Sequence, residues 1–392
     1  MKIDDKTSHN SPSLRFPEFN GEWKNTTLEE CVDFLDGQRK PIKSDDRKGE
    51  KRLYPYYGAS GIIDYIDEYI FDGDYILLSE DGANIIDRNY RVAFIANGKI
   101  WVNNHAHVLQ PHKEMNINFL SEALERINYA IYNTGTTMPK LNQEICRKIN
   151  LNVPSLSEQN KIGNLLYLLN ERIATQNRLI DRLQSLMIGL NNSLYEQYGN
   201  DITTSFMELG YSYSGLSGKS AKDFGSGKPF ITYLNVYSNI IVDETDYQYV
   251  RINDGEKQNI VRTGDVLFTL SSETPEEVGI GSVYLGEKEV YLNSFCFGIH
   301  IERNQLAYSP YLSYYVTSTA FRKFIYPFAQ GSTRFNLCKA DFEKASIKLP
   351  SLDNQKRISA MLDCIAEKIQ AEKAILEYYN IQRQYLLRQM FI

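Results

Sequence analysis

The chain has 392 residues, which is enough for two domains of ordinary size, each with its own hydrophobic core. Its 43 basic and 49 acidic residues give a net charge of −6, so it lacks the basic excess of a protein held to nucleic acid mainly by charge. Cys31, Cys146, Cys296, Cys338 and Cys364 lie far apart and form no CxxC pair, which argues against a disulfide framework or a zinc ribbon.

The N-terminal segment MKIDDKTSHN is polar and contains no apolar run of signal-peptide length. No later window approaches the roughly eighteen consecutive apolar residues of a membrane-spanning helix. We therefore expect a cytoplasmic protein that does not bind membranes.

Residues 1–154 are predicted to form a first domain of mixed α/β structure. The segment FDGDYILLSEDGA (71–83) is typical of a strand that follows a Gly-Asp turn, and IWVNNHAHVL (100–109) of a second strand that carries asparagine. His105 and His107 fall on the same face of that strand, but no third ligand follows at a convincing spacing. We predict no metal site.

A long helix is predicted over 155–198. Pro154 ends the preceding strand, and Ser155 with Glu158 has the spacing of a capping box. Apolar residues then recur every seven residues over four heptads, as in the seam of a coiled coil. The seam positions are Leu166, Ile173, Ile180 and Met187, and Leu169, Gln176, Leu183 and Leu190.

The second half of the chain repeats the first. Residues 331–386 align without a gap onto 135–190 at a constant offset of 196, and 13 of the 56 pairs are identical. Upstream, 261–277 resembles 71–83 and 290–299 resembles 100–109 more loosely. The repeat predicts a second domain over 199–349 and a second helix over 350–392.

The second helix carries the same seam, with Glu372 at the position of Gln176. Its other seam positions are Leu362, Ile365, Ile369, Leu376, Tyr379 and Leu386. Each helix of about 38 residues would be roughly 55 Å long, more than a small domain needs. We therefore predict an α+β protein whose two helices pair as an antiparallel coiled coil with pseudo-twofold symmetry. The alternative is that each helix packs only on its own domain.

No catalytic motif is found. GLSGKS (215–220) is not a P-loop, because Tyr213 stands where that motif needs a glycine. The sequence contains no Asn-Pro-Pro-aromatic tetrapeptide of amino-methyltransferases, no glycine-rich turn suited to S-adenosylmethionine, and no GxSxG or HExxH motif. We predict a chain without catalytic residues or a cofactor of its own.

The strings LRFPEFNGEW (14–23), GKPFITYLNVY (227–237), PSLSEQNKI (154–162) and PSLDNQKRI (350–358), together with the duplication, resemble the type I restriction-modification specificity-subunit family over nearly the whole chain. The resemblance implies two target-recognition domains that each read half of a bipartite DNA target. It also implies that the helices fix the spacing of the half-sites and dock two methyltransferase subunits, through which restriction and translocase subunits join. S-adenosylmethionine, ATP and magnesium would belong to those partners, which methylate adenine or restrict the DNA.

For phosphate contacts the repeated segments GTTMPKLN (135–142) and GSTRFNLC (331–338) are candidates, because small hydroxyls and backbone N–H groups bind anions. An ordinary glycine turn is the competing interpretation. The residues concerned are Thr136, Thr137, Lys140, Ser332, Thr333 and Arg334.

Candidate base-reading residues are polar side chains in loops, whose groups match the edges of bases in the major groove. They are Gln38, Arg39, Lys40, Lys43, Asn84, Asn104 and His105 in the first domain, and Lys219, Lys222, Tyr233, Asn235, Tyr237, Ser271, Ser272 and Arg334 in the second. Asn103 and Asn293 match between the halves, and we expect them to be structural because residues that read different bases should differ.

Two other functions remain open from the sequence. The chain could be a self-sufficient DNA-modifying enzyme, against which the missing cofactor motif counts. It could also be a two-domain scaffold that binds proteins and no DNA.

Overall fold

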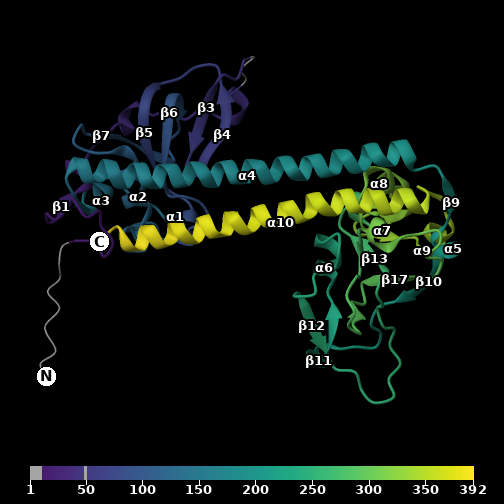
Figure 1. Ribbon diagram of the computed structural model, residues 1–392. Helices are drawn as coiled ribbons and strands as arrows, with labels where there is room; N and C mark the ends of the chain where they lie inside the picture. The colour runs from purple at the N-terminus through teal and green to yellow at the C-terminus, as the bar shows by residue number, and fades with distance from the viewer. Residues whose placement is uncertain (1–10, 48–50) are drawn as a thin grey trace, which may run out of the picture. The chain divides into compact units, whose positions relative to one another are not determined.

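The computed structural model describes residues 11–47 and 51–392 (Figure 1). The first ten residues, on which the argument against an export signal rests, lie outside the described residues. Contacts divide the chain into two units. The first unit comprises the chain up to Asn177 together with Ala374–Ile392, and the second unit comprises Arg178–Lys373. Each unit thus contains one mixed α/β domain and part of each long helix.

A six-stranded sheet forms the centre of the first unit, with strand order β2-β7-β5-β6-β3-β4. All neighbouring strands are antiparallel except β3 and β6, which are parallel. The strands are β2 (Val32–Phe34), β3 (Tyr54–Gly58), β4 (Gly61–Ile66), β5 (Phe71–Ser79), β6 (Ala93–Val102) and β7 (Ala106–Pro111). The predicted strands within 71–83 and 100–109 are therefore present as β5, the end of β6 and β7.

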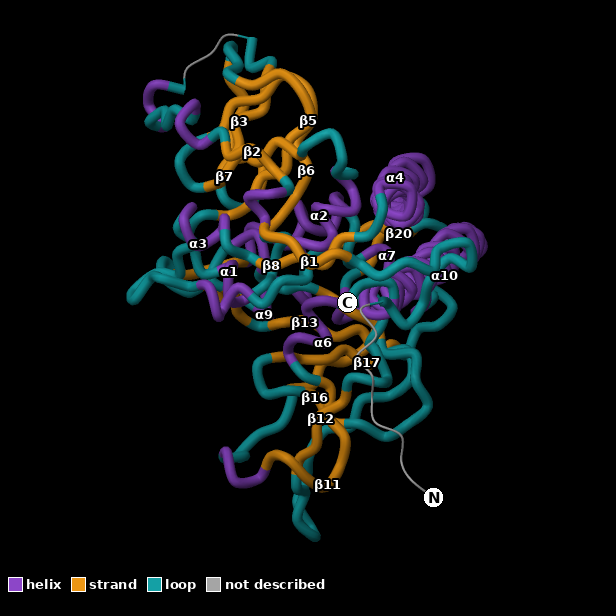
Figure 2. Tube along the Cα trace, turned by 90° about the vertical axis from the view of Figure 1, so that its left-hand side faces the viewer, coloured by secondary structure: helices purple, strands orange, loops and turns teal. Residues whose placement is uncertain are grey.

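One face of this sheet is covered by α2 (Ile117–Glu125), which packs on β5 and β6 (Figure 2). Asn116 caps the helix by accepting a hydrogen bond from the Phe119 amide at 3.0 Å. Ile76, Leu78 and Leu120 are fully buried in the core between sheet and helix. Two short helices complete the domain, α1 (Asn84–Asp87) and α3 (Gln143–Arg147).

The second unit divides its strands among smaller sheets. A four-stranded antiparallel sheet has the order β10-β17-β13-β15, and two three-stranded sheets have the orders β12-β11-β16 and β14-β19-β18. The strands are β10 (Gly210–Ser214), β11 (Phe224–Ile231), β12 (Tyr247–Val250), β13 (Val266–Thr269), β14 (Ser271–Ser272), β15 (Gly281–Val283), β16 (Tyr291–Leu292), β17 (Cys296–Ile301), β18 (Ala329–Gly331) and β19 (Phe335–Leu337).

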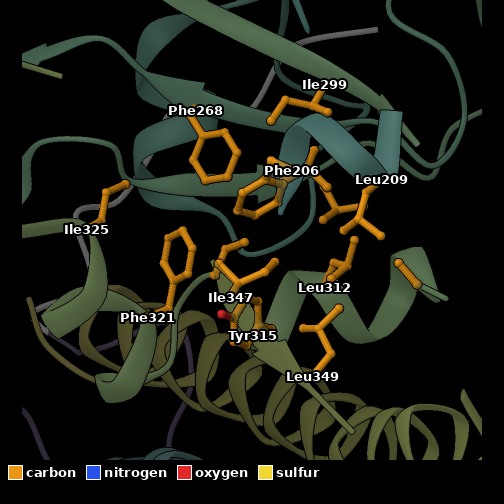
Figure 3. Close-up of a cluster of buried hydrophobic side chains, with 14 of the residues drawn as sticks. Phe206, Leu209, Phe268, Ile299, Leu312, Tyr315, Phe321, Ile325, Ile347 and Leu349 are labelled. Atoms are coloured by element: carbon orange, nitrogen blue, oxygen red, sulfur yellow. The ribbon is translucent and has the colours of Figure 1, made fainter. Parts of the chain in front are cut away.

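An aromatic core holds the second unit together. Phe206, Phe268 and Phe321 lie close together in it, with ring centroids 5.5–6.1 Å apart (Figure 3). They are fully buried, as is Phe342 beside them. Around this core lie α5 (Phe206–Leu209), α7 (Ser309–Tyr315), α8 (Thr319–Ile325) and α9 (Lys339–Lys344). Helix α6 (Tyr233–Ser238) packs on β13 and β15, and its Val236 belongs to a second buried cluster.

A two-stranded antiparallel ribbon leads into each long helix. In the first unit β1 (Lys24–Thr27) pairs with β8 (Asn150–Val153), and in the second β9 (Ile202–Thr204) pairs with β20 (Ile347–Leu349). The helices that follow are α4 (Leu156–Tyr198) and α10 (Leu352–Gln389), with 43 and 38 residues.

The predicted capping box at the start of α4 is only half formed. The Glu158 amide donates to Ser155 Oγ at 3.4 Å, but the Glu158 carboxylate binds Arg15 instead of the cap backbone. Both oxygens of the nearly buried Glu158 accept from the Arg15 guanidinium at 2.7 Å, and this bidentate ion pair fixes the N-terminal segment to the helix.

The long helices pack together within each unit. In the first unit Ile162 and Leu166 of α4 share a buried cluster with Met390 and Phe391, which follow α10. In the second unit Leu190 and Leu194 of α4 pack on the core that contains Leu362 of α10. The start of α4 therefore lies beside the end of α10, and the end of α4 beside the start of α10, as expected of an antiparallel pair. The predicted fold, two mixed α/β domains each followed by a long pairing helix, is confirmed.

Every predicted seam residue is buried or partly buried. Leu166, Leu169, Ile180, Leu362, Ile369 and Glu372 are buried, and Ile173, Gln176, Leu183, Met187, Leu190, Ile365, Leu376, Tyr379 and Leu386 are partly buried. The Lys368 ammonium lies 2.5 Å from the Glu372 carboxylate, one helical turn away, and so compensates its charge.

Candidate nucleic-acid interface

The two units build the same turn from the same backbone hydrogen bonds. In the first unit the Asn103 amide donates to the Tyr57 carbonyl oxygen at 3.0 Å, beside the parallel pair β3–β6. In the second unit the Asn293 amide donates to the Ile231 carbonyl oxygen at 3.0 Å, beside the parallel pair β11–β16. The ends of the parallel strand pairs β3–β6 and β11–β16 are thus equivalent.

Each of these asparagines also fixes the turn that follows it. Asn103 Oδ1 accepts from the His105 amide at 2.8 Å, and Asn293 Oδ1 accepts from the Phe295 amide at 2.9 Å. Because the side chains are engaged with their own backbone, both asparagines are structural residues, as predicted.

A second set of equivalent bonds ties this turn to a loop far along the chain. The Glu80 amide donates to the His105 carbonyl oxygen at 2.9 Å, and the Glu80 carbonyl oxygen accepts from the Leu141 amide at 2.7 Å. Leu270 makes the same two bonds, to the carbonyl oxygen of Phe295 at 2.9 Å and from the amide of Leu337 at 2.8 Å. We call this set of bonds, with those of the asparagines, the shared framework.

The loop that reaches this framework needs a glycine in both units. A Cβ atom at Gly135 would stand 1.8 Å from the Met138 carbonyl oxygen, and one at Gly331 would stand 2.1 Å from the Arg334 carbonyl oxygen. Glycine is therefore required for the tight turn, which explains why it recurs. The hydroxyl residues predicted to contact phosphate, Thr136, Thr137, Ser332 and Thr333, are all exposed at this turn.

The side chains that the shared framework presents differ between the units. The equivalent pairs are Asp81 and Ser271, His105 and Phe295, and Met138 and Arg334. In the first unit His105 Nδ1 lies 2.9 Å from the Asp81 carboxylate. In the second unit the apolar Phe295 stands in place of His105, and the cationic Arg334 stands in place of Met138. The same backbone hydrogen bonds therefore present different side chains.

In the second unit these positions border a hollow of about 340 Å³. Among its lining residues are the predicted DNA contacts Tyr233, Tyr237, Ser271, Ser272 and Arg334. The Tyr233 and Tyr237 rings stack at 6.0 Å with an interplanar angle of 17°. Their hydroxyls donate to the Ser271 carbonyl oxygen and to the Glu277 carboxylate, each at 2.8 Å. The hollow therefore has an aromatic wall that is held rigidly.

The first unit contains a largely buried ionic cluster of Asp36, Glu80 and His107, beside strand β7. His107 Nδ1 lies 2.6 Å from the Asp36 carboxylate and Nε2 lies 2.8 Å from the Leu141 carbonyl oxygen. Burial lowers the pKa of His107, but the hydrogen bonds and charges of Asp36 and Cys146 together outweigh burial and raise the pKa to about 10. The ring is therefore an imidazolium that donates from both nitrogens.

Asp36, Glu80 and His107 are close enough together to hold a metal ion. However, Arg39 donates to the Glu80 carboxylate at 2.7 Å, and both His107 nitrogens are engaged as donors. A doubly protonated imidazole has no lone pair for a metal. The cluster is an internal ion-pair network, and it joins the loop of Asp36 to strand β7 and to Leu141.

Most predicted DNA contacts are accessible. Gln38, Lys40, Lys43, Asn104, His105, Thr136, Thr137, Lys140, Lys222, Ser332, Thr333 and Arg334 are exposed, whereas Ser271 and Ser272 are largely buried at the floor of the hollow. Both amide atoms of Asn84 bind the Tyr90 backbone, so this side chain closes a turn.

The structure corrects three of the base-reading candidates. Asn235 is fully buried and donates to the carbonyl oxygens of Asp243 and Asp246, each at 2.9 Å. The side chain of Lys219 is 5% exposed and donates to the Arg251 carbonyl oxygen and the Glu256 carboxylate, both at 2.6 Å. These groups are used inside the protein, so Asn235 and Lys219 are structural.

Arg39 is the third correction. Its side chain is 13% exposed and donates to the Glu80 carboxylate at 2.7 Å and to the Ala106 carbonyl oxygen at 2.8 Å. It belongs to the buried network and not to a DNA surface.

Sequence reasoning missed Asp81, Glu273 and Phe295. When the two halves are aligned through Asn103 and Asn293, His105 lies opposite Phe295. This alignment could have identified Phe295 from the sequence. Glu273 was not among the sequence candidates, and its place at the hollow identifies it.

No helix in the described part of the chain is long and apolar enough to cross a membrane. Comparison with solved structures shows the fold. An S subunit of a type I restriction-modification system from M. genitalium superposes with a TM-score of 0.61 at 16% identity, over 97% of this chain and 99% of that one. A chain from a structure on the assembly of a type I restriction-modification system gives a TM-score of 0.53 at 18% identity, over 94% and 97%.

Sequence comparison identifies the family. A protein of Haemophilus influenzae named a type I restriction enzyme specificity subunit is 27% identical over 364 residues, which cover 87% of this chain and 86% of that protein. A Mycoplasma pneumoniae protein named a type I specificity subunit is 25% identical over 378 residues, covering 89% and 94%. The family model for the type I restriction modification DNA specificity domain matches twice, at residues 20–185 and 216–378. Since these matches cover most of the chain, it belongs to the family of non-catalytic DNA specificity subunits of type I restriction-modification systems.

Proposed function

We propose that this specificity subunit reads a bipartite DNA target, one half-site with each mixed α/β domain. The observation that supports this most directly is the shared framework, which recurs in both units but presents Asp81, His105 and Met138 in one and Ser271, Phe295 and Arg334 in the other. A duplicated reader whose side chains differ recognises two different short sequences.

The long helices set the unread gap between the half-sites. Each begins directly after one domain, and α4 alone has 43 residues, about 65 Å at 1.5 Å per residue. Buried seam residues such as Leu166 and Leu362 keep the helices paired, so the spacer is stiff. A stiff spacer fixes the half-site separation as dimer geometry does in other DNA-binding proteins.

The partners of this chain are two methyltransferase subunits, and restriction and translocase subunits join through that complex. Apolar side chains that no domain covers support a protein partner on the helices. In the first unit Leu168, Tyr378, Ile381 and Tyr385 of the long helices are 55–71% exposed, and apolar side chains exposed on a helix offer a surface that a protein partner can bury. S-adenosylmethionine, ATP and magnesium bind to these partners, which carry out adenine methylation or restriction in the cytoplasm.

The phosphate backbone is contacted at the glycine turns of both units. Thr136, Thr137, Ser332 and Thr333 offer exposed hydroxyls there, and in the first unit Lys140 adds positive charge beside them. Because the whole chain carries a net charge of −6, such local groups and the partner subunits supply the salt-dependent part of the affinity.

The test is to purify the complex of this chain with its methyltransferase subunits and let it methylate random DNA. Single-molecule sequencing should reveal one two-part adenine motif with a constant gap, and omission of this chain should abolish it. Methylation without sequence preference would favour a scaffold that does not read DNA. Binding of labelled S-adenosylmethionine to the isolated chain, measured by equilibrium dialysis, would favour a self-sufficient modifying enzyme and contradict the proposal.

A further inference from the structure

The hollow in the second unit holds two charged groups that the protein itself does not use. Arg334 and Glu273 are both exposed at its rim. Within residues 11–47 and 51–392, no hydrogen bond or ion pair involves the side chain of either residue. A guanidinium and a carboxylate at one hollow, each with its hydrogen-bonding groups available, form a recognition surface for a polar ligand.

The other walls of the hollow are fixed and largely apolar. Glu277 accepts from the Tyr237 hydroxyl at 2.8 Å and from Ser272 Oγ at 3.1 Å, so it supports the aromatic wall. Leu234 and Phe295 are 67% and 57% exposed at the rim. Such a rim fits a flat ligand with polar edges, since apolar faces can cover a base while the charged groups bind its edge.

The carboxylates decide which part of DNA this hollow can approach. A phosphate would be repelled by Glu273 and Glu277, which leaves it to the hydroxyls of the neighbouring glycine turn. A base edge fits both charges, because arginine binds the O6 and N7 atoms of guanine bidentately and a carboxylate accepts from the exocyclic amino group of cytosine.

We propose that this hollow is the base-reading site of the second domain, in which Arg334 binds guanine and Glu273 accepts a hydrogen bond from the exocyclic amino group of a cytosine or adenine. This inference rests on the proposed function, since it presumes that the second domain reads DNA. It adds the residues that read and the chemistry of the bases they select.

The shared framework supports the assignment independently of the hollow. Arg334 occupies the position of Met138, and Phe295 that of His105, although the backbone bonds around them are the same. Different side chains presented on the same backbone bonds are what a reader of two different half-sites requires. The same position in the first unit, with Asp81 and His105 paired, therefore reads the other half-site.

The experiment uses the full complex with methyltransferase subunits and compares the methylated motif of four variants of this chain. Arg334→Met installs the residue of the first unit, and Arg334→Lys keeps the charge but removes the bidentate geometry. Glu273→Gln tests the carboxylate. Lys288→Met, at an exposed lysine outside the hollow, is the matched control.

Both Arg334 variants should lose discrimination for guanine at one position of one half-site by about 10- to 100-fold, while the other half-site stays as in the wild type. Glu273→Gln should relax a neighbouring position, and Lys288→Met should change nothing. If Arg334→Met prevented assembly of the complex and the other variants did not, the methylated motifs of Arg334→Lys and Glu273→Gln would test the proposal.

Two outcomes overturn the assignment. One is an unchanged motif in the Arg334 variants, and the other is an equal loss of methylation at all sites, which indicates a phosphate contact. Failure of the proposed function looks different, because the wild-type complex would then show the same methylation with and without this chain.

Discussion

Gln159 and Gln355 perform the same structural task in the two halves of the molecule. Gln159 Nε2 donates to the Pro154 carbonyl oxygen at 3.0 Å, and its Oε1 accepts from the Asn116 amide at 2.9 Å. Gln355 Nε2 donates to the Pro350 carbonyl oxygen at 2.9 Å, and its Oε1 accepts from the Tyr308 amide at 2.8 Å. Each carboxamide is buried and thereby joins the first turn of a long helix to its domain.

Replacement of either glutamine by alanine should lower the free energy of unfolding by about 2–4 kcal/mol, because buried backbone groups lose their partners. Urea denaturation of the single variants measures this. Lys356→Ala, at an exposed lysine beside Gln355, is the control and should change the free energy by less than about 0.5 kcal/mol. A similarly small effect of both glutamine variants would show that the carboxamides do not hold the helix starts.

The buried His107 makes the stability of the first unit depend on pH. Its pKa is raised to about 10 in the folded protein, above the value of 6.5 for a free imidazole. The imidazolium therefore contributes its full stabilisation below about pH 6.5, and that contribution declines as the pH rises towards 10. The stability difference between the wild type and His107→Asn should be largest near pH 6.5 and should shrink across this window in urea titrations.

The control for this prediction is His105→Asn, since the His105 side chain is 50% exposed and its partner Asp81 lies near the surface. This variant should give a small difference at every pH. A constant difference between the wild type and His107→Asn from pH 6.5 to 10 would contradict a buried imidazolium.

The long helices and their pairing were predictable because their signals are local and repeated. The recurrence of Leu166, Ile173 and Ile180 every seven residues indicates the buried face of a helix. The ungapped repeat then predicts a second helix with the same buried face. The start of each helix follows from a proline and a serine, since these residues disfavour continuation of a strand and favour a helix cap.

The candidate site was less predictable, because burial of a polar side chain depends on residues that are distant in the sequence. Asn235 was predicted to lie in a loop, yet it lies in helix α6 and its carboxamide binds the backbone of 243–246. Lys219 is covered because Glu256, 37 residues away, pairs with it. Phe295 shows the converse, since an apolar residue between strands suggests core but is 57% exposed at the hollow.

Lengthening both helices together should lengthen the unread gap. Seven residues inserted between Asn177 and Arg178, with seven more between Lys373 and Ala374, add two turns to each helix and preserve the heptad register. The added length is about 10 Å, or about three base pairs at 3.4 Å per pair. Methylome sequencing should report the same half-sites with a gap longer by about three bases. An unchanged gap would contradict the role of the helices as the spacer.

Truncation of the exposed aromatic residues of α10 should weaken binding of the methyltransferase without unfolding the chain. Tyr378 and Tyr385 are 71% and 56% exposed, so replacing both by serine removes apolar surface that only a partner can bury. Loss of two aromatic side chains from the centre of an interface costs at least about 2 kcal/mol, which corresponds to a dissociation constant raised about 30-fold. Tyr90→Ser, at a tyrosine 65% exposed on a loop, is the matched control and should leave that constant unchanged in calorimetric titrations. If the double variant bound as tightly as the control, the methyltransferase would have to dock elsewhere on the chain, and these side chains would need another explanation for their exposure.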